Sequence, residues 1–357
     1  MKARPHPLRP GFLFAGDAPN GDGLPKETDM ARAWHLMSRP QGLPTADNFA
    51  LKDVDLPAVG PGMIRVRNRW LSVDPYMRGR MNDVKSYVPP FQIDAPMEGG
   101  AVGEVVESQS DGLAAGDLVL HMAGWRDEAV LAAQAVNKLP NAGVEPQAFL
   151  GNMGLTGGTA YFGLLEAAAA KEGDIVFVSA AAGAVGSAVV QIAKAKGMKV
   201  IGSAGGADKC DFVKSLGADA VVDYKAQPIL KGLAAAAPDG IDVYFDNVGG
   251  DHLDAAFALA RKDARFAICG MIEGYNAAEP MCFKFIMRVI AMRIRVQGFI
   301  YTDYMPRMGE FHRDMAGWIG SGQVKARDTI VEGLEKTPDA FLGLFEGANT
   351  GKMLVRL

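Results

Sequence analysis

Two patterns of hydrophobic and polar residues divide the chain near residue 155. In the first part, short apolar runs at residues 63–66, 103–107 and 118–121 are separated by Gly, Pro and Asp and show no helical periodicity over a long span. Such runs are typical of antiparallel strands joined by turns. We therefore expect a β-rich domain up to about residue 152.

Beyond this point, strand-like and helix-like patterns alternate. Helices are expected at residues 156–170 and 306–321, and strands are expected at residues 175–179, 199–203, 220–223, 241–246, 265–270 and 353–356. Alternation of this kind implies right-handed βαβ crossovers and a parallel sheet covered on both faces. The predicted fold class is α/β, with a β-rich domain and a doubly wound parallel sheet.

The junction of the first parallel strand with its helix indicates a dinucleotide site. Residues 175–186 read IVFVSAAAGAVG, and helical apolar spacing follows over residues 187–196. Small residues let backbone amides close on an anion at a helix N-terminus. The match is to AxxGxxG, at Ala180, Gly183 and Gly186, which is less specific than GxGxxG. The alternative is an ordinary strand, turn and helix whose small residues serve packing.

The tip of the next strand favours NADP(H) over NAD. NAD-specific sites carry an Asp or Glu about 20 residues after the glycines, where it receives the ribose hydroxyls. Here the strand runs into Ala204, Gly205 and Gly206 without an acid, and Lys209 follows. A missing carboxylate and an added cation suit a 2′-phosphate. Lys209 has an alternative role as a solvated surface residue.

Composition excludes several other classes. The 357 residues are 49% hydrophobic and 22% charged, which fits a globular chain with two domains. A formal net charge of −4 without a long basic block argues against nucleic acid and anionic membranes as partners. Three distant cysteines exclude a disulfide framework and a CxxC zinc ribbon, and they fit a cytoplasmic location.

The first 29 residues differ from the rest. They are rich in Pro and Gly, and their apolar run is too short for the run of about 7–15 residues that a signal peptide needs. The chain also lacks an apolar run that could span a membrane. We interpret residues 1–29 as a flexible extension, with Met30 as an alternative start.

Seven motifs after Met30 together resemble one family. They read LSVDPYMRGRM (71–81), MEGGAVGEVVES (97–108), GNMGLTGGTAYFGL (151–164), AAAGAVGSAVVQIAKAKG (180–197), YFDNVGG (244–250), AICGMIEGYN (267–276) and GANTGK (347–352). The chain resembles the zinc-independent medium-chain dehydrogenase/reductases of the leukotriene B4 dehydrogenase and prostaglandin reductase group, which includes plant alkenal double-bond reductases and bacterial curcumin reductase. This implies a GroES-like catalytic domain at residues 30–155, completed by residues 325–357, and a Rossmann NADP-binding domain at residues 156–324.

The resemblance also implies individual cofactor contacts. The diphosphate turn comprises Gly183, Ala184, Val185 and Gly186, and the 2′-phosphate falls to Lys209 and Tyr224. The contacts implied around the nicotinamide half are Asn247, Cys269, Gly270, Tyr275, Phe299, Tyr301 and Asn349. Each of these residues also has a purely structural alternative. Asn247 could cap a helix, Cys269 could be a buried small hydrophobic residue and Tyr224 could pack against its neighbours.

A zinc-dependent alcohol dehydrogenase would share this fold but needs metal ligands. A catalytic zinc takes about three Cys, His or carboxylate ligands, and a structural zinc typically takes four thiolates. The chain before Gly151 contains no cysteine, and His35 and His121 have no partner at ligand spacing. We therefore expect hydride transfer without a metal.

Reduction of an activated carbon–carbon double bond suits such a site. Hydride addition to the β-carbon of an α,β-unsaturated ketone or aldehyde moves negative charge onto the carbonyl oxygen, so hydrogen-bond donors and a proton source are sufficient. Tyrosine, with a pKa near 10, is a donor at neutral pH. The resemblance implies two donors, the nicotinamide-ribose hydroxyl of the cofactor and a tyrosine. The candidate tyrosines are Tyr275 and Tyr76, with Tyr87 a weaker one, and Tyr76 has an alternative packing role beneath the site.

Two other functions and the assembly state remain open. The alternatives are an NADPH quinone oxidoreductase and a non-catalytic NADPH-binding protein. Residues 277–297 lack the proline-rich loop with a tyrosine that some mammalian prostaglandin reductases carry; they are helix-like and are expected to form a substrate wall or dimer contact. The resemblance implies a homodimer, and the edge of a strand at residues 293–301 is the expected contact. The sequence does not define the physiological substrate, the stereochemistry or the proton donor.

Overall fold

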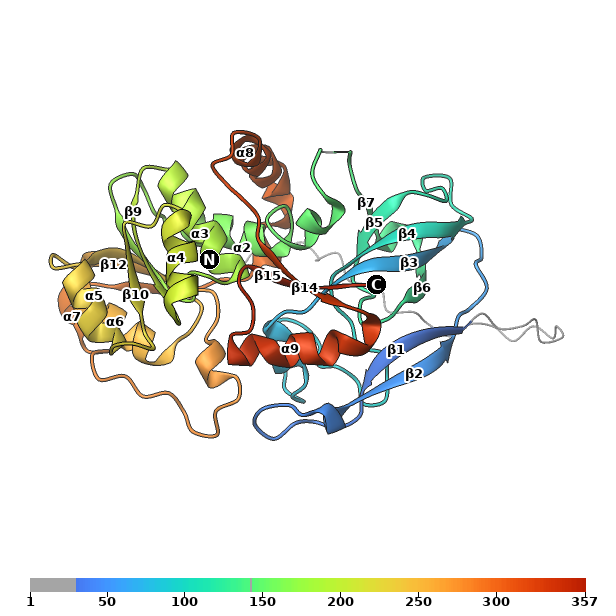
Figure 1. The fold of residues 1–357 in the computed structure, drawn as a ribbon, viewed down its shortest axis with the longest axis horizontal. Coiled ribbons are helices and arrows are strands. Elements are labelled where there is room, and N and C mark those ends of the chain that lie inside the picture. The colour runs from blue at the N-terminus through green and yellow to red at the C-terminus, as the bar shows by residue number, and fades with distance from the viewer. Residues whose placement is uncertain (1–29, 142) are drawn as a thin grey trace, which may run out of the picture.

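A seven-stranded sheet, mostly antiparallel, forms the core of the first domain (Figure 1). The computed structural model describes residues 30–141 and 143–357, so the expected N-terminal extension lies outside the described residues. The strand order is β14-β15-β3-β4-β5-β7, and β6 pairs with β3. The strands are β3 (Met63–Ser72), β4 (Ala101–Ser108), β5 (Leu118–His121), β6 (Glu128–Ala132), β7 (Asn137–Lys138), β14 (Asp328–Glu332) and β15 (Lys352–Arg356).

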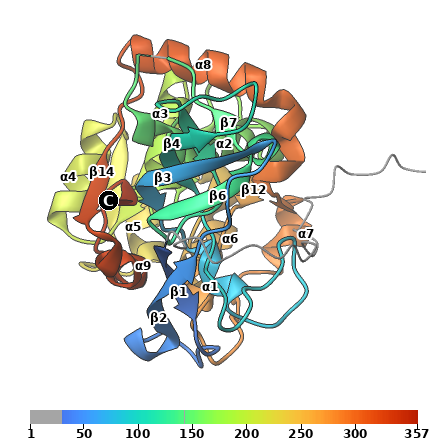
Figure 2. The ribbon, with the colours of Figure 1, turned by 90° about the vertical axis from the view of Figure 1, so that its right-hand side faces the viewer.

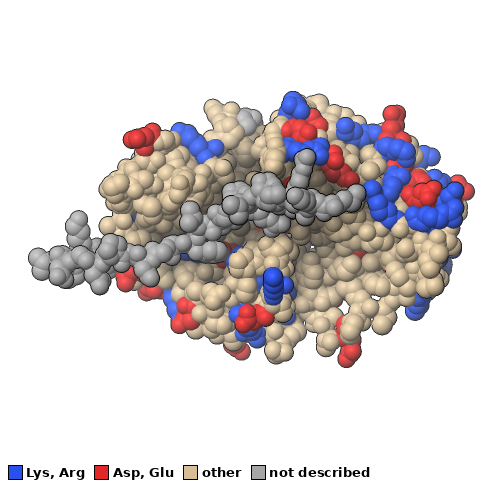
Figure 3. Space-filling model, turned by 180° about the vertical axis from the view of Figure 1, so that it is seen from behind, with Lys and Arg blue, Asp and Glu red and all other residues tan. Residues whose placement is uncertain are grey.

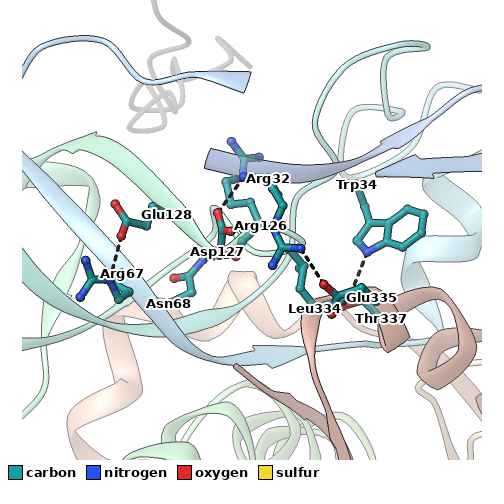
Figure 4. Close-up of polar contacts among 10 residues, drawn as sticks. All are labelled: Arg32, Trp34, Arg67, Asn68, Arg126, Asp127, Glu128, Leu334, Glu335 and Thr337. Carbon is teal, nitrogen blue, oxygen red and sulfur yellow. Dashed lines mark hydrogen bonds and ion pairs between the residues drawn. The ribbon is translucent and has the colours of Figure 1, made fainter. Parts of the chain in front are cut away.

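The C-terminal residues belong to this first domain. Strand β15 pairs with β3, and Figure 2 shows β14 and helix α9 (Thr337–Glu346) on the same side of the molecule as β3. A hairpin of β1 (Met30–Leu36) and β2 (Phe49–Asp55) is also tied to this end of the chain. Figure 4 shows Arg32 bonded to both Asp127 and Glu335, and the Trp34 indole donating to the Leu334 carbonyl at 2.8 Å.

The second domain is a six-stranded parallel sheet in the order β10-β9-β8-β11-β12-β13. Its strands are β8 (Ile175–Val178), β9 (Lys199–Ala204), β10 (Ala220–Asp223), β11 (Ile241–Asp246), β12 (Ala260–Ile268) and β13 (Arg295–Gly298). Its helices are α2 (Leu155–Phe162), α3 (Ala184–Ala195), α4 (Ala207–Ser215), α5 (Ile229–Ala236), α6 (Gly250–Leu259), α7 (Arg288–Met292) and α8 (Met308–Gly320). This is a Rossmann-type arrangement, so the predicted fold class is confirmed.

Alternating side chains build a core on each face of this sheet. Along β8, Val176 and Val178 pack in one cluster with α2, α3 and α8, while Phe177 packs in the other with α5 and α6. Successive strand residues point to opposite faces, so a fully apolar strand is covered on both sides. The carboxyl ends of the strands are left at one edge, where the loops of the site begin.

Four expected elements differ from the structure. The helical pattern at residues 277–297 was misleading, since only α7 is helical within it. The edge strand expected at residues 293–301 is limited to β13, and the helix expected from residue 306 begins at Met308 after a 3₁₀ segment, Tyr301–Arg307. Helix α2 passes into a π-helical turn, Gly163–Ala167, instead of continuing regularly to residue 170.

The surface carries charges of both signs. On the face seen in Figure 3, basic side chains are accompanied by acidic ones. Ion pairs join β12 to its surroundings, with Arg265 on Asp174 and Arg261 on Asp242. Among the described residues, no helix has both the length and the apolar character needed to cross a membrane.

Candidate functional site

The turn after β8 leaves room for an anion at the start of α3. Ala180 has a left-handed conformation with φ 47°, and Gly183 is the N-cap residue of the helix. A Cβ atom on Gly186 would collide with the Ala180 carbonyl oxygen, so glycine is required for the close approach. Ala184 and Val185 form the first turn of α3, whose backbone N–H groups lack helical partners and suit a phosphate.

A tyrosine and a lysine meet beyond the tip of β9. A Cβ atom on Gly205 would lie 2.8 Å from the Tyr224 hydroxyl and 3.0 Å from Lys225 Cε. Tyr224 is 42% exposed. The predicted residue Tyr224 therefore lies beside the strand tip, together with a cation that the sequence reasoning missed.

The carboxylate of Asp223, at the end of the neighbouring strand β10, also lies close to the loop after β9. The Asp223 carboxylate accepts backbone N–H groups from Gly206 at 3.0 Å and from Lys225 at 2.9 Å. These bonds lower the pKa of Asp223, so the group is ionised at neutral pH. One of its oxygens thus fixes the loop after β9 instead of standing free at the tip of that strand.

The second cation, Lys209, lies in α4 and reaches the other domain. Its Nζ donates to the Gly347 carbonyl at 2.6 Å. Burial, and then the charge of Lys225, lower the pKa of Lys209. Two ammonium groups close enough to influence each other form a positive region that suits a dianionic phosphate.

The carboxyl ends of β8, β11 and β12 are locked together by hydrogen bonds. The Asp246 carbonyl accepts from the N–H groups of Cys269, at 2.9 Å, and Gly270, at 3.1 Å. Asn247 Nδ2 donates to the Ser179 carbonyl at 2.8 Å. The N-cap residue of α6 is Gly249, so Asn247 is not a helix cap. Burial raises the pKa of the Cys269 thiol to about 12, which keeps it neutral.

The three candidate tyrosines line one cavity of about 150 Å³. Tyr76 lies in α1 (Tyr76–Arg80), Tyr87 lies in the following irregular segment, and Tyr275 comes from the loop after β12. A Cβ atom on Gly270 would lie 2.9 Å from the Tyr275 hydroxyl, so this hydroxyl adjoins the sheet edge. Arg80 also lines the cavity.

These tyrosines are hydrogen-bond donors at neutral pH. Burial, and then the nearby Cys269, raise the pKa of Tyr275 to about 12. Burial is also the main cause of the raised pKa of Tyr76 and of Tyr87. A raised pKa means that the phenol keeps its proton. Neutral tyrosines that line a cavity are donors that can stabilise an oxygen atom that gains negative charge.

Phe299 and Tyr301 lie against α2 and the π-helical turn that follows it. The Phe299 ring packs edge-on against Phe245, with 6.1 Å between ring centroids, and a Cβ atom on Gly163 would collide with it. The Tyr301 ring occupies the space beside Gly158 in the same way. Glycines in this helical segment therefore allow two predicted aromatic residues to pack closely on it.

Asn349 lies where the two domains meet. Its side chain donates to the Gly351 carbonyl at 2.7 Å, and the Gly351 N–H donates to the Ala182 carbonyl at 2.7 Å. The segment around Asn349 therefore contacts the glycine turn directly, although it is separated from it by more than 150 residues. Among residues 30–141 and 143–357, no three His, Cys, Asp or Glu side chains are grouped so that they could hold a metal ion.

Comparisons with known proteins agree with this arrangement. Residues 32–139 match the family described as the N-terminal domain of oxidoreductase, and residues 184–317 match the family described as zinc-binding dehydrogenase. The NADPH-dependent curcumin reductase of Escherichia coli is 43% identical, over 91% of this chain and 96% of that protein. The 2-alkenal reductase (NADP(+)-dependent) of Nicotiana tabacum is 38% identical, over 88% of this chain and 94% of that protein.

A solved structure extends the similarity to three dimensions. CurA from Vibrio vulnificus, crystallised in complex with NADPH, is 45% identical and matches with a TM-score of 0.86, over 91% of this chain and 98% of that one. Relatives of this identity and coverage share both domains. The chain therefore belongs to the medium-chain dehydrogenase/reductase family, in the group that includes curcumin reductase and 2-alkenal reductase.

Proposed function

We propose that this protein uses NADPH to reduce the carbon–carbon double bond of α,β-unsaturated ketones and aldehydes. The observation that carries the proposal is that Tyr76, Tyr87 and Tyr275 line one cavity beside the carboxyl edge of the parallel sheet. The names of the relatives, curcumin reductase and 2-alkenal reductase, support the same chemistry. Both relatives are named as NADP(H)-dependent.

The residues of the second domain fit NADPH. The turn at Gly183 and Gly186 can offer backbone N–H groups to the diphosphate. Glycine is needed at residue 186, because a Cβ atom there would collide with the Ala180 carbonyl oxygen. The ammonium groups of Lys209 and Lys225, with the hydroxyl of Tyr224, would hold the 2′-phosphate. We assign the nicotinamide half to Asn247, Cys269, Gly270, Tyr275, Phe299, Tyr301 and Asn349.

The tyrosines supply the rest of the chemistry. When bound, NADPH provides the hydride for the β-carbon of the substrate. Tyr275 and Tyr76 would donate hydrogen bonds to the carbonyl oxygen, where negative charge develops in the enolate. A proton then completes the reaction at the α-carbon. Tyr87 is 61% exposed, so it lies where a proton can be exchanged between the cavity and solvent.

A substrate panel tests this function. Purified protein would be given NADPH with 2-alkenals, with enones and with quinones, and the products would be identified by mass spectrometry. We expect NADPH to be consumed with alkenals and enones and to yield the saturated carbonyl compound. Turnover of quinones alone, or binding of NADPH without turnover of any acceptor, would contradict the proposal.

We also propose that the protein is a cytoplasmic homodimer joined through β13. This strand ends the parallel sheet, and its Val296 is 44% exposed. Met287 and Ile290, both 71% exposed, place further apolar surface close to it in sequence. An uncovered strand edge with apolar neighbours can pair with its copy about a twofold axis. Light scattering should give a dimer mass, and Val296→Glu should shift it toward the monomer; a monomeric native protein would refute this.

A further inference from the structure

We propose that Arg78 is a positioning residue that holds the three tyrosine-bearing segments around the cavity. It does not line the cavity, and it acts through residues next to Tyr275 and before Tyr87. This inference rests on the proposed function, because it assigns Arg78 a part in the reaction of the same site.

The guanidinium of Arg78 contacts three separate segments. Nε donates to Asn276 Oδ1 at 2.8 Å, Nη1 donates to Asn82 Oδ1 at 2.8 Å, and Nη2 donates to the Gly42 carbonyl at 2.9 Å. Asn276 directly follows Tyr275 in the chain. Arg78 therefore bonds to three parts of the chain, and two of its acceptors, Asn82 and Asn276, lie in the segments that carry the cavity-lining residues Tyr87 and Tyr275.

Each contact fixes a different part of the site. Arg78 lies on α1 two residues after Tyr76, and Asn82 opens the irregular segment that carries Tyr87. Gly42 belongs to the loop between β1 and β2, and Figure 2 shows this hairpin beside α1. A Cβ atom on Gly42 would lie 3.8 Å from the Asn276 carbonyl oxygen, so the loop also packs on that residue.

The bond to Asn276 crosses between the domains. Arg78 belongs to the first domain, and Asn276 follows β12 of the parallel sheet. Tyr76 and Tyr275 come from different domains as well, so their separation depends on how these two segments are held. The hydrogen bond from Arg78 to Asn276 is a direct link between the two tyrosine-bearing segments.

The chemistry of the side chain suits this role. Arg78 is only 4% exposed, and its three acceptors are uncharged amide or peptide oxygens. Burying a cation costs solvation, and burial lowers the pKa of this guanidinium. Arg78 fixes the relative positions of its three acceptors, because a planar guanidinium donates hydrogen bonds in fixed directions. A lysine ammonium cannot reproduce this geometry.

The first test removes the link between the domains and leaves Arg78 in place. Asn276→Leu deletes the acceptor, whereas Asn276→Asp keeps an oxygen in the same position. The control is Arg69→Gln on β3, where the native arginine pairs with the half-buried Glu104. For Asn276→Leu we expect kcat for enone reduction to fall about tenfold or more, because small displacements of catalytic groups cause losses of this order.

Two further readouts separate positioning from a general structural role. The Kd for NADPH should change less than about twofold in Asn276→Leu, which corresponds to less than about 0.4 kcal/mol of binding free energy. Asn276→Asp should recover most of kcat. Native kcat in Asn276→Leu, or equal impairment of the leucine and aspartate variants, would overturn the inference.

An independent measurement does not need turnover. Hydrogen exchange should rise in residues 82–91 and 270–276 of Arg78→Lys and of Asn276→Leu, while strands β8 to β11 keep native protection. Unchanged exchange in both segments would refute the positioning role. If the native protein reduces no enone, the proposed function fails, and the exchange result still decides whether Arg78 couples the segments. Asn276→Leu also serves if Arg78→Lys does not fold.

Discussion

Replacing Lys209 with methionine should weaken binding of NADPH and leave binding of NADH almost unchanged. The two coenzymes differ only in the 2′-phosphate, which we place between Lys209 and Lys225. Methionine keeps an unbranched apolar side chain but removes the charge. The Lys209 ammonium already donates to the Gly347 carbonyl at 2.6 Å, so it is held in place before a phosphate arrives.

The size of the effect follows from the contacts. A hydrogen bond to a charged group contributes about 1.5–3 kcal/mol. Each 1.4 kcal/mol corresponds to about tenfold in Kd, so Lys209→Met should raise the Kd for NADPH about 10- to 100-fold. Lys225 is more exposed, so Lys225→Met should lie at the lower end of that range. The effects of the two substitutions should not add, because the ammonium groups act on each other.

Fluorescence titration with NADPH and with NADH measures both affinities. It should be run at low and at high salt, because the contribution of the lysines to NADPH binding weakens with ionic strength. Lys231→Met, which removes an exposed charge from α5, is the matched control and should change neither Kd. Equal losses for NADPH and NADH, or an equal effect of the control, would refute a phosphate site at these lysines.

Three further variants test other parts of the site and fold. Tyr275→Phe should lower kcat for enones about 10- to 100-fold with the Kd for NADPH nearly unchanged, as steady-state kinetics and titration would show; native kcat would remove Tyr275 from the mechanism. Gly186→Ala should raise the Kd for NADPH at least tenfold and destabilise the fold by about 1–3 kcal/mol in urea, because the new Cβ collides with the Ala180 carbonyl; native binding would argue against the turn as the phosphate site. Burial lowers the pKa of His252 to about 4, below the value of 6.5 expected in the unfolded chain, so the unfolded state takes up the proton first. The free energy of unfolding should therefore fall as the pH drops from about 6.5 toward 4, by up to about 3 kcal/mol from this residue, and His252→Phe should flatten that fall; an unchanged pH profile would contradict it.

The parallel sheet was predictable because its strands are apolar on both faces. The five expected strands are present. Their apolar residues pack against helices on the two faces of the sheet, as the continuous apolar runs predict. Helix α3 begins at Ala184, three residues before the expected start, because the glycine turn leads straight into the helix. Local spacing thus located this domain well, with errors at the ends of its elements.

Residues 277–297 show where local spacing misleads. Their apolar residues have helical spacing, but the side chains bind α6 instead. Phe283 packs against Phe257 with 6.0 Å between ring centroids, and the Phe285 N–H donates to Asp254 Oδ1 at 2.8 Å. These contacts come from another part of the chain, and they override the helical preference of the segment.

In the site, too, features carried by one stretch of sequence were predictable, and features that depend on distant residues were not. Motifs such as YFDNVGG and ICGMIEGYN predict the sheet edge because each motif is one strand end with its loop. Lys225 was missed although it directly follows Tyr224, and a charge beside that tyrosine was the available signal. Arg78 and its acceptors have no shared sequence pattern, since Gly42, Asn82 and Asn276 meet only in the folded protein.

The transfer of labelled hydrogen tests the central claim most directly. The protein would be given an enone and NADPH that carries deuterium at the transferable position of the nicotinamide ring, and the product would be examined by NMR. The account predicts a saturated ketone with deuterium on the β-carbon. Deuterium on the carbonyl carbon of an allylic alcohol, or a saturated product without the label, would contradict it.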